Sequence, residues 1–152
     1  MLLLKEADFR KEIKAAPRAG YVFVGEEDYL KQLAVSYAKQ TLCPDEALSC
    51  FNLIVLDAVD HTPDALPEVL RDALMALPMM ADRKLVILRG MDFEHPSRPH
   101  TLDRLCEVLA ELPEYDYNVL IVNVAADCLD PGYLPKRPST TLTKLAEHLT
   151  PV

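Results

Sequence analysis

The sequence predicts an α/β domain built on a doubly wound, mainly parallel sheet. Four short apolar runs alternate with segments whose apolar residues recur every three or four positions, which is typical of strands joined by crossover helices. Half of the 152 residues are hydrophobic and 26% are charged, a balance that supports one domain with a sizeable core. Such alternation favours right-handed crossovers and helices on both faces of the sheet.

The four apolar runs are the predicted strands, at residues 21–24, 51–56, 84–88 and 117–122. Each run is short, rich in β-branched or aromatic residues and bounded by turn-forming residues. Continuous apolar character indicates strands that are buried on both faces of a parallel sheet.

Three segments between these runs have helical spacing, at residues 29–42, 64–77 and 102–112. The second contains an apolar stripe formed by Leu66, Val69, Leu70, Ala73, Leu74 and Leu77. Shorter helices are expected at residues 7–14 and 141–149. We therefore expect one face of each longer helix to pack on the sheet.

The C-terminal part of the sequence breaks the alternation. Residues 127–138 contain three prolines and are expected to form a long irregular connection. Residues 150–152 follow the last helix, where the pattern would require another strand, so this helix is expected to lead nowhere. We therefore expect the 152 residues to be one domain of a longer chain.

Composition excludes several classes of protein. Sixteen Lys and Arg against 24 Asp and Glu give a net charge of −8, which argues against strong direct binding to DNA or RNA. No apolar run approaches the roughly 20 residues of a membrane span. The four cysteines form no CxxC pair and are predicted to be buried free thiols, which suggests a reducing cytoplasm: Cys43, Cys50, Cys106 and Cys128.

The turn after the first strand is where a nucleotide usually binds in such a sheet. Gly25 and Lys31 match the phosphate-binding pattern GxxxxGK[ST], but Leu30 replaces its second glycine and Gln32 replaces its hydroxyl residue. Residues 26–28 are all acidic and would repel phosphates. We therefore predict a degenerate phosphate-binding turn, in which these acids cap the following helix instead.

Two other sites for chemistry can be weighed from spacing. Asp57 follows the second strand, as a phosphoacceptor does in a receiver-type signalling domain, with Glu26 and Glu27 as its acidic pair. No strand-end lysine completes that set. A divergent P-loop NTPase or kinase is the other enzymatic alternative, although no catalytic residues can be recognised.

One loop gathers possible metal ligands: Asp92, Glu94, His95 and His100. Pro96 and Pro99 break the helical spacing that would bring such ligands together, so a solvated loop and no metal is the preferred interpretation.

The segment after the second long helix is difficult to explain as core. Pro78 is predicted to end that helix at about Leu77, which leaves Met79 and Met80 in a short connection. At least one of these side chains is expected to be exposed, where flexible methionine suits an apolar pocket on another protein. In the alternative, one methionine packs beneath the loop and the other covers a helix.

Three motifs together resemble the N-terminal domain of the bacterial DNA polymerase III delta subunit: residues 21–30, Phe51-Asn52 and residues 77–86. That family is the clamp-loader subunit that opens the sliding clamp, and the resemblance covers about residues 1–150. It implies an AAA+-like, P-loop NTPase fold with a decayed phosphate-binding turn. It also implies a cytoplasmic protein of a DNA-directed DNA polymerase holoenzyme, with no ATPase activity of its own and no cofactor.

The resemblance also implies a binding site. In this family a bulky apolar pair, commonly including Phe, wedges into the clamp, and Met79 and Met80 occupy those positions here. Leu77, Pro78 and Ala81 would shape the rim of the wedge. The implied partners are the sliding clamp (the beta subunit) and, through the family's lid and collar domains that lie outside these 152 residues, other clamp-loader subunits.

Overall fold

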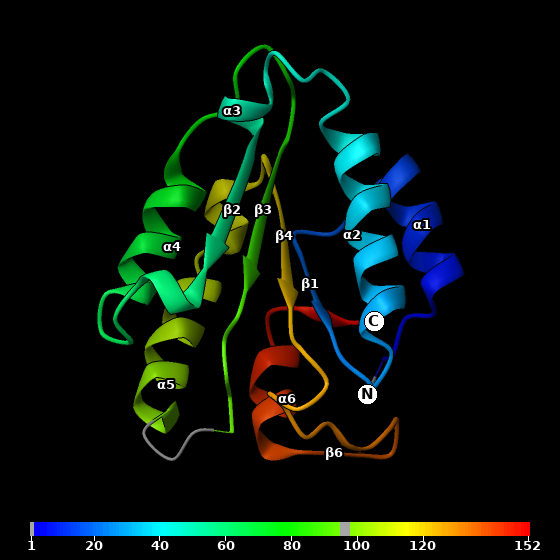
Figure 1. Cartoon of the computed structure of the whole chain (residues 1–152), viewed down its shortest axis with the longest axis vertical. Coiled ribbons are helices and arrows are strands. Elements are labelled where there is room, and N and C mark those ends of the chain that lie inside the picture. The colour runs from blue at the N-terminus through cyan, green and yellow to red at the C-terminus, as the bar shows by residue number, and fades with distance from the viewer. Residues whose placement is uncertain (1, 95–97) are drawn as a thin grey trace.

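A computed structural model describes residues 2–94 and 98–152 and has three layers, α/β/α (Figure 1). Its central sheet has the strand order β2-β3-β4-β1-β7, and each neighbouring pair is parallel. The strands are β1 (Gly20–Phe23), β2 (Leu53–Asp57), β3 (Lys84–Arg89), β4 (Asn118–Asn123) and β7 (Thr150–Pro151). The predicted doubly wound, mainly parallel sheet is therefore confirmed.

Helices cover both faces of this sheet (Figure 1). One face carries α1 (Glu6–Ala15) and α2 (Asp28–Leu42), and the other carries α4 (Leu66–Met75), α5 (Arg98–Leu109) and α6 (Thr140–Ala146). The smaller elements are α3 (Ser49–Asn52), the 3-10 helices η1 (Ala58–Asp60) and η2 (Leu112–Tyr115), and the antiparallel pair β5 (Gly132–Tyr133) and β6 (Arg137–Pro138).

The two-residue alternation of the strands explains the two layers of core. Leu85 and Ile87 of β3 pack on the α1/α2 side, whereas Val86 and Leu88 pack on the α4/α5/α6 side. All four are buried, as expected for a strand inside a parallel sheet. On the α1/α2 side, the ring of Phe9 lies edge-on to Tyr21 and Phe23, with centroids 4.9 and 5.1 Å apart.

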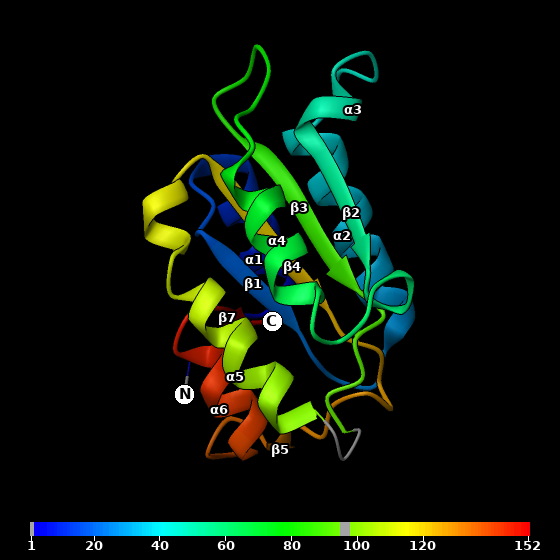
Figure 2. The same ribbon diagram turned by 90° about the vertical axis from the view of Figure 1, so that its left-hand side faces the viewer.

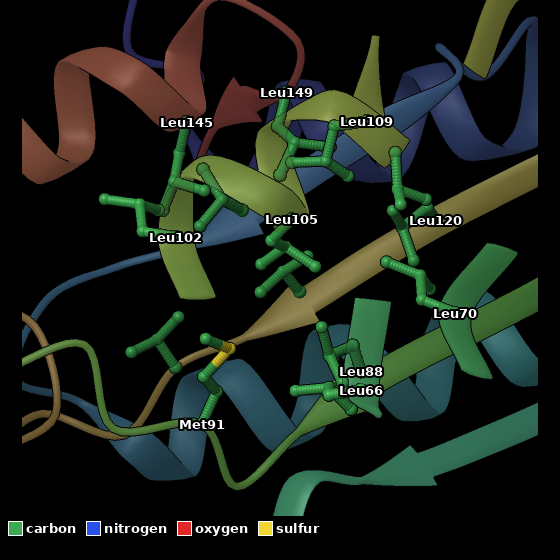
Figure 3. Packing of buried hydrophobic residues seen from close by; sticks show 14 of the residues in the cluster. Leu66, Leu70, Leu88, Met91, Leu102, Leu105, Leu109, Leu120, Leu145 and Leu149 are labelled. Carbon is green, nitrogen blue, oxygen red and sulfur yellow. The ribbon is translucent and has the colours of Figure 1, made fainter. Parts of the chain in front are cut away.

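Leucines dominate the core on the other face (Figure 3). Leu66 and Leu70 of α4 and Leu105 and Leu109 of α5 project toward the sheet and are buried. The stripe predicted for α4 is therefore present, except that Leu77 lies beyond the end of the helix and is 74% exposed.

Several element boundaries differ from the prediction. The predicted strand at residues 51–56 begins only at Leu53, because the preceding residues form the short helix α3. Helix α4 is shorter than residues 64–77 at both ends, and its C-cap Ala76 is already extended (φ −62°, ψ 132°).

The expectation that no strand follows the last helix was wrong. Residues Thr150–Pro151 form β7 beside β1, and the Val152 N–H donates to the Val22 carbonyl at 2.9 Å. The Leu4 N–H donates to the Pro151 carbonyl at 2.9 Å, so the N-terminal segment covers this strand from the other side. The hairpin β5–β6 likewise lies within residues 127–138, which were expected to be irregular.

The thiols are less buried than predicted. All four cysteines are free, but Cys50 of α3 is exposed and the other three are only partly buried. Among residues 2–94 and 98–152, no helix is long and apolar enough to cross a membrane.

Candidate functional site

The ammonium group of Lys31 is fully engaged inside the protein. Lys31 is only 7% exposed, and its Nζ donates to the carbonyl oxygens of Gly25 and Val124, each at 2.6 Å, and to Asp28 Oδ1 at 3.0 Å. An ammonium has three N–H donors, and each has an acceptor here. Lys31 therefore ties the turn after β1 to the end of β4 and offers no free donor to a phosphate.

The surroundings of this turn are acidic. Gly25 (φ +113°) makes the turn, and Asp28 Oδ1 also accepts from the Ala126 N–H at 3.1 Å. A hollow of about 250 Å³ beside the turn is lined by Glu6, Glu26 and Glu27 among mainly apolar residues. A triphosphate placed there would meet like charges, so the surroundings of this turn disfavour phosphate binding.

The predicted capping role of the acids is only partly right. Asp28 lies in the first turn of α2, near the positive end of the helix dipole. Glu27 occupies the N-cap position, but its side chain makes no cap hydrogen bond.

The strand order contradicts the receiver-type alternative. A flavodoxin-like receiver has its first strand between the second and third strands, whereas here β3 and β4 separate β2 from β1. Asp57 therefore lies at the end of an edge strand, away from Glu26 and Glu27. Its carboxylate instead accepts from the Val59 N–H at 3.2 Å and faces Arg89 Nε at 3.4 Å.

The possible metal ligands are not brought together in the part of the chain that the structure describes. No group of three or more His, Cys, Asp and Glu side chains there could hold a metal ion. Asp92 and Glu94 bond to backbone N–H groups, and His95 lies outside the described residues.

A protruding loop, residues 76–83, joins α4 to β3 (Figure 2) and contains the predicted apolar pair. Met80 is 85% exposed and Met79 is 43% exposed, so both side chains reach solvent. Leu77 and Ala81 are also exposed, and Pro78 is half-buried. The alternative in which one methionine is sealed beneath the loop does not match this exposure.

Met80 has a left-handed backbone conformation, with φ +53°. For a residue other than glycine this conformation costs on the order of 1 kcal/mol, and it persists only where neighbouring contacts impose it. The neighbouring contact available to impose it is at Met79, whose backbone is hydrogen-bonded to Asn52.

Asn52 fixes Met79 through both ends of its side-chain amide. Its Nδ2 donates to the Met79 carbonyl at 2.8 Å, and its Oδ1 accepts from the Met79 N–H at 2.7 Å. Asn52 is only 4% exposed, so its amide is buried and both bonds are at least partly shielded from water. The sequence alone shows Asn52 only as part of the Phe51-Asn52 motif, and its one local signal is an amide side chain directly before an apolar strand.

Three side chains cap the C-terminal end of α4, where the 76–83 loop begins. Lys84 Nζ donates to the Ala73 carbonyl, Asn118 Nδ2 to Leu74 at 2.8 Å, and the Tyr117 hydroxyl to Met75 at 2.7 Å. The last carbonyls of an α-helix have no N–H partner within the helix. These three side chains supply the missing donors where α4 ends at Met75. The start of the loop is thereby attached to β3 and to the start of β4.

Lys84 is fully buried, although the sequence shows it only as a basic residue that follows the methionine pair. Burial disfavours the charged form and lowers the pKa of the Lys84 amine to about 8.

The order of the five parallel strands, with helices on both faces, gives an α/β fold of the AAA+-like type. The structure is similar to a Bacillus subtilis DNA clamp loader delta protein, with a TM-score of 0.73 and 23% identity over 97% of this chain and 42% of that one. It is also similar to a DNA polymerase III gamma subunit-related protein from Thermotoga maritima, with a TM-score of 0.59 and 14% identity over 98% of this chain and 45% of that one. The resemblance predicted from sequence is thus confirmed for the fold.

The chain spans less than half of the length of either of these proteins. No family model and no curated protein matches the sequence.

Replacing Lys31 by Met tests its structural role. The change leaves the Gly25 and Val124 carbonyls without their lysine donor, so we expect the free energy of unfolding to fall by about 2 kcal/mol in urea. Lys11→Met on the exposed side of α1 serves as the control and should change it by less than about 0.5 kcal/mol. Equal or greater stability of Lys31→Met would show that the turn does not depend on this lysine.

The buried amine of Lys84 predicts a dependence of stability on pH. Its pKa in the folded protein, about 8, lies below the ordinary 10.5, so between these values the unfolded chain binds more protons and the free energy of unfolding rises with pH. The slope approaches about 1.4 kcal/mol per pH unit only above pH 8, so wild type should gain about 1.5 kcal/mol over Lys84→Met between pH 8 and 9.5.

Urea denaturation of both proteins at pH 7, 8 and 9.5 measures this gain. Titration of tyrosines and cysteines affects both proteins equally, so it cancels in the difference between their free energies of unfolding. If the free energy of unfolding changed equally with pH in the two proteins, the low pKa of Lys84 would be contradicted.

Proposed function

We propose that this domain binds a sliding clamp of DNA replication and acts as a clamp-loader subunit of the delta type. The fold likeness to a clamp loader delta protein supports this function. The observation that carries it is the 76–83 loop, where two adjacent methionines are exposed on a backbone fixed by Asn52.

The 76–83 loop has the properties of a wedge for an apolar pocket. Burying a methionine side chain contributes about 1.5–3 kcal/mol, and Met79 contributes less than Met80 because it is already partly covered. A fixed backbone reduces the entropy lost on binding. Leu77, Pro78 and Ala81 lie beside the pair and would form the rim of the contact.

Clamp opening would follow from a difference in affinity rather than from catalysis. A ligand shifts a conformational equilibrium only by the amount that it binds one state better than the other. The wedge would therefore have to bind the pocket more tightly in the open ring than in the closed ring. This role needs no nucleotide, metal or cofactor in the domain itself.

With Lys31 engaged internally and acidic residues beside Gly25, ATP would be bound by other clamp-loader subunits. Those subunits would be contacted through domains that lie outside these 152 residues. The net charge of −8 disfavours strong direct contact with DNA, and the cytoplasm is the expected location.

The double variant Met79→Ser/Met80→Ser tests the wedge. We expect it to weaken binding to the cognate sliding clamp at least about 100-fold, because about 3 kcal/mol of apolar burial is lost. Surface plasmon resonance with immobilised clamp measures the affinity.

The matched control is Tyr29→Ser/Val59→Ser, because these side chains are 70% and 77% exposed on α2 and η1. Both double variants should melt like wild type. Full clamp affinity of a folded Met79→Ser/Met80→Ser protein would rule out the wedge, and unfolding of that variant would show that the methionines belong to the core.

A further inference from the structure

Helix α3 lies beside the 76–83 loop at one end of the sheet (Figures 1 and 2). The parallel register pairs Leu53 of β2 with Leu85 of β3, so the segments that precede these strands project from the same edge. The two hydrogen bonds of Asn52 to Met79 join the segments directly. Phe51 directly precedes Asn52. A partner that contacts Met79 would therefore lie close to Phe51.

Phe51 differs from the other phenylalanines of the chain. The sequence contains four, all within the described residues; Phe9, Phe23 and Phe93 are at most 7% exposed, whereas Phe51 is 49% exposed. The N–H groups of Phe51 and Asn52 both donate to the Leu48 carbonyl at 3.0 Å, which closes the single turn of α3. With Asn52 directed inward and its amide bonded, α3 carries Phe51 on its outer side.

We infer that Phe51 is a second anchor for the same partner, so that α3 and the 76–83 loop form one docking surface. This inference rests on the proposed function and takes the sliding clamp as the occupant, because Asn52 makes the surface of α3 continuous with that of the loop. The clamp would then offer an apolar recess for a rigid ring next to its pocket for the flexible methionines.

The second anchor has a physical consequence for docking. A domain held only by the methionines of the 76–83 loop could rotate about that one contact. Two contacts on joined elements fix the orientation of the domain on the sliding clamp. Phenylalanine suits this role because its ring presents a large apolar area with few rotatable bonds, and aromatic residues are enriched at the centres of interfaces.

The first test compares clamp affinities of wild type, Phe51→Ala and Tyr29→Ala. We expect Phe51→Ala to weaken binding about tenfold, less than the double methionine variant, and Tyr29→Ala to bind like wild type. Wild-type affinity of Phe51→Ala, with binding still lost in Met79→Ser/Met80→Ser, would overturn the second anchor and leave the proposed function standing. Failure of wild type to bind the clamp would overturn both.

The second test uses the unaltered chain, so it does not depend on how a variant folds. Cys50 is exposed and precedes Phe51, whereas Cys106 lies on α5, in a different part of the fold from α3 (Figure 2). With saturating clamp, we expect alkylation of Cys50 by N-ethylmaleimide to slow at least tenfold, while Cys106 reacts at its rate in the free protein. An unchanged rate at Cys50 in the complex would overturn the inference.

Discussion

The exposed apolar surface of this domain depends on one buried contact, the pair of hydrogen bonds between the Asn52 side chain and the backbone of Met79. Without it, the N–H and carbonyl of Met79 would have to find partners in water, and the left-handed Met80 would lose the neighbour that fixes it. The caps from Lys84, Tyr117 and Asn118 fix the start of the same loop. Polar contacts within the domain thus keep the apolar side chains of the 76–83 loop exposed on its surface.

The two ends of the sheet have different properties. At the carboxyl ends of the strands, where nucleotides usually bind in this architecture, Lys31 and Asp28 bond to the segment after β4 and close the turn. At the amino ends of β2 and β3, the chain projects α3 and the 76–83 loop. The same scaffold therefore exposes an apolar loop at one end of the sheet, while at the other end Lys31 joins the turn after β1 to the segment after β4.

Sequence periodicity predicted the sheet because four strands and three long helices are long enough to show it. It missed β7 and the β5–β6 hairpin, since two-residue strands carry no periodicity and are defined by their partners. The exposure of at least one of Met79 and Met80 was predictable from Pro78 and a short connection, but the sequence left open whether the other packs beneath the loop. The roles of Asn52 and Lys84 were not, because their partners lie 27 and 11 residues away and only the folded sheet brings them together.

The most direct test of this account is the clamp affinity of Asn52→Asp, measured at a temperature where circular dichroism shows the variant to be folded. The carboxylate has the shape of the amide but cannot donate to the Met79 carbonyl. We expect the affinity of this variant to be at least tenfold lower than that of wild type, although Met79, Met80 and Phe51 are all present. Wild-type affinity in the folded variant would contradict it, because the loop would then dock without being fixed.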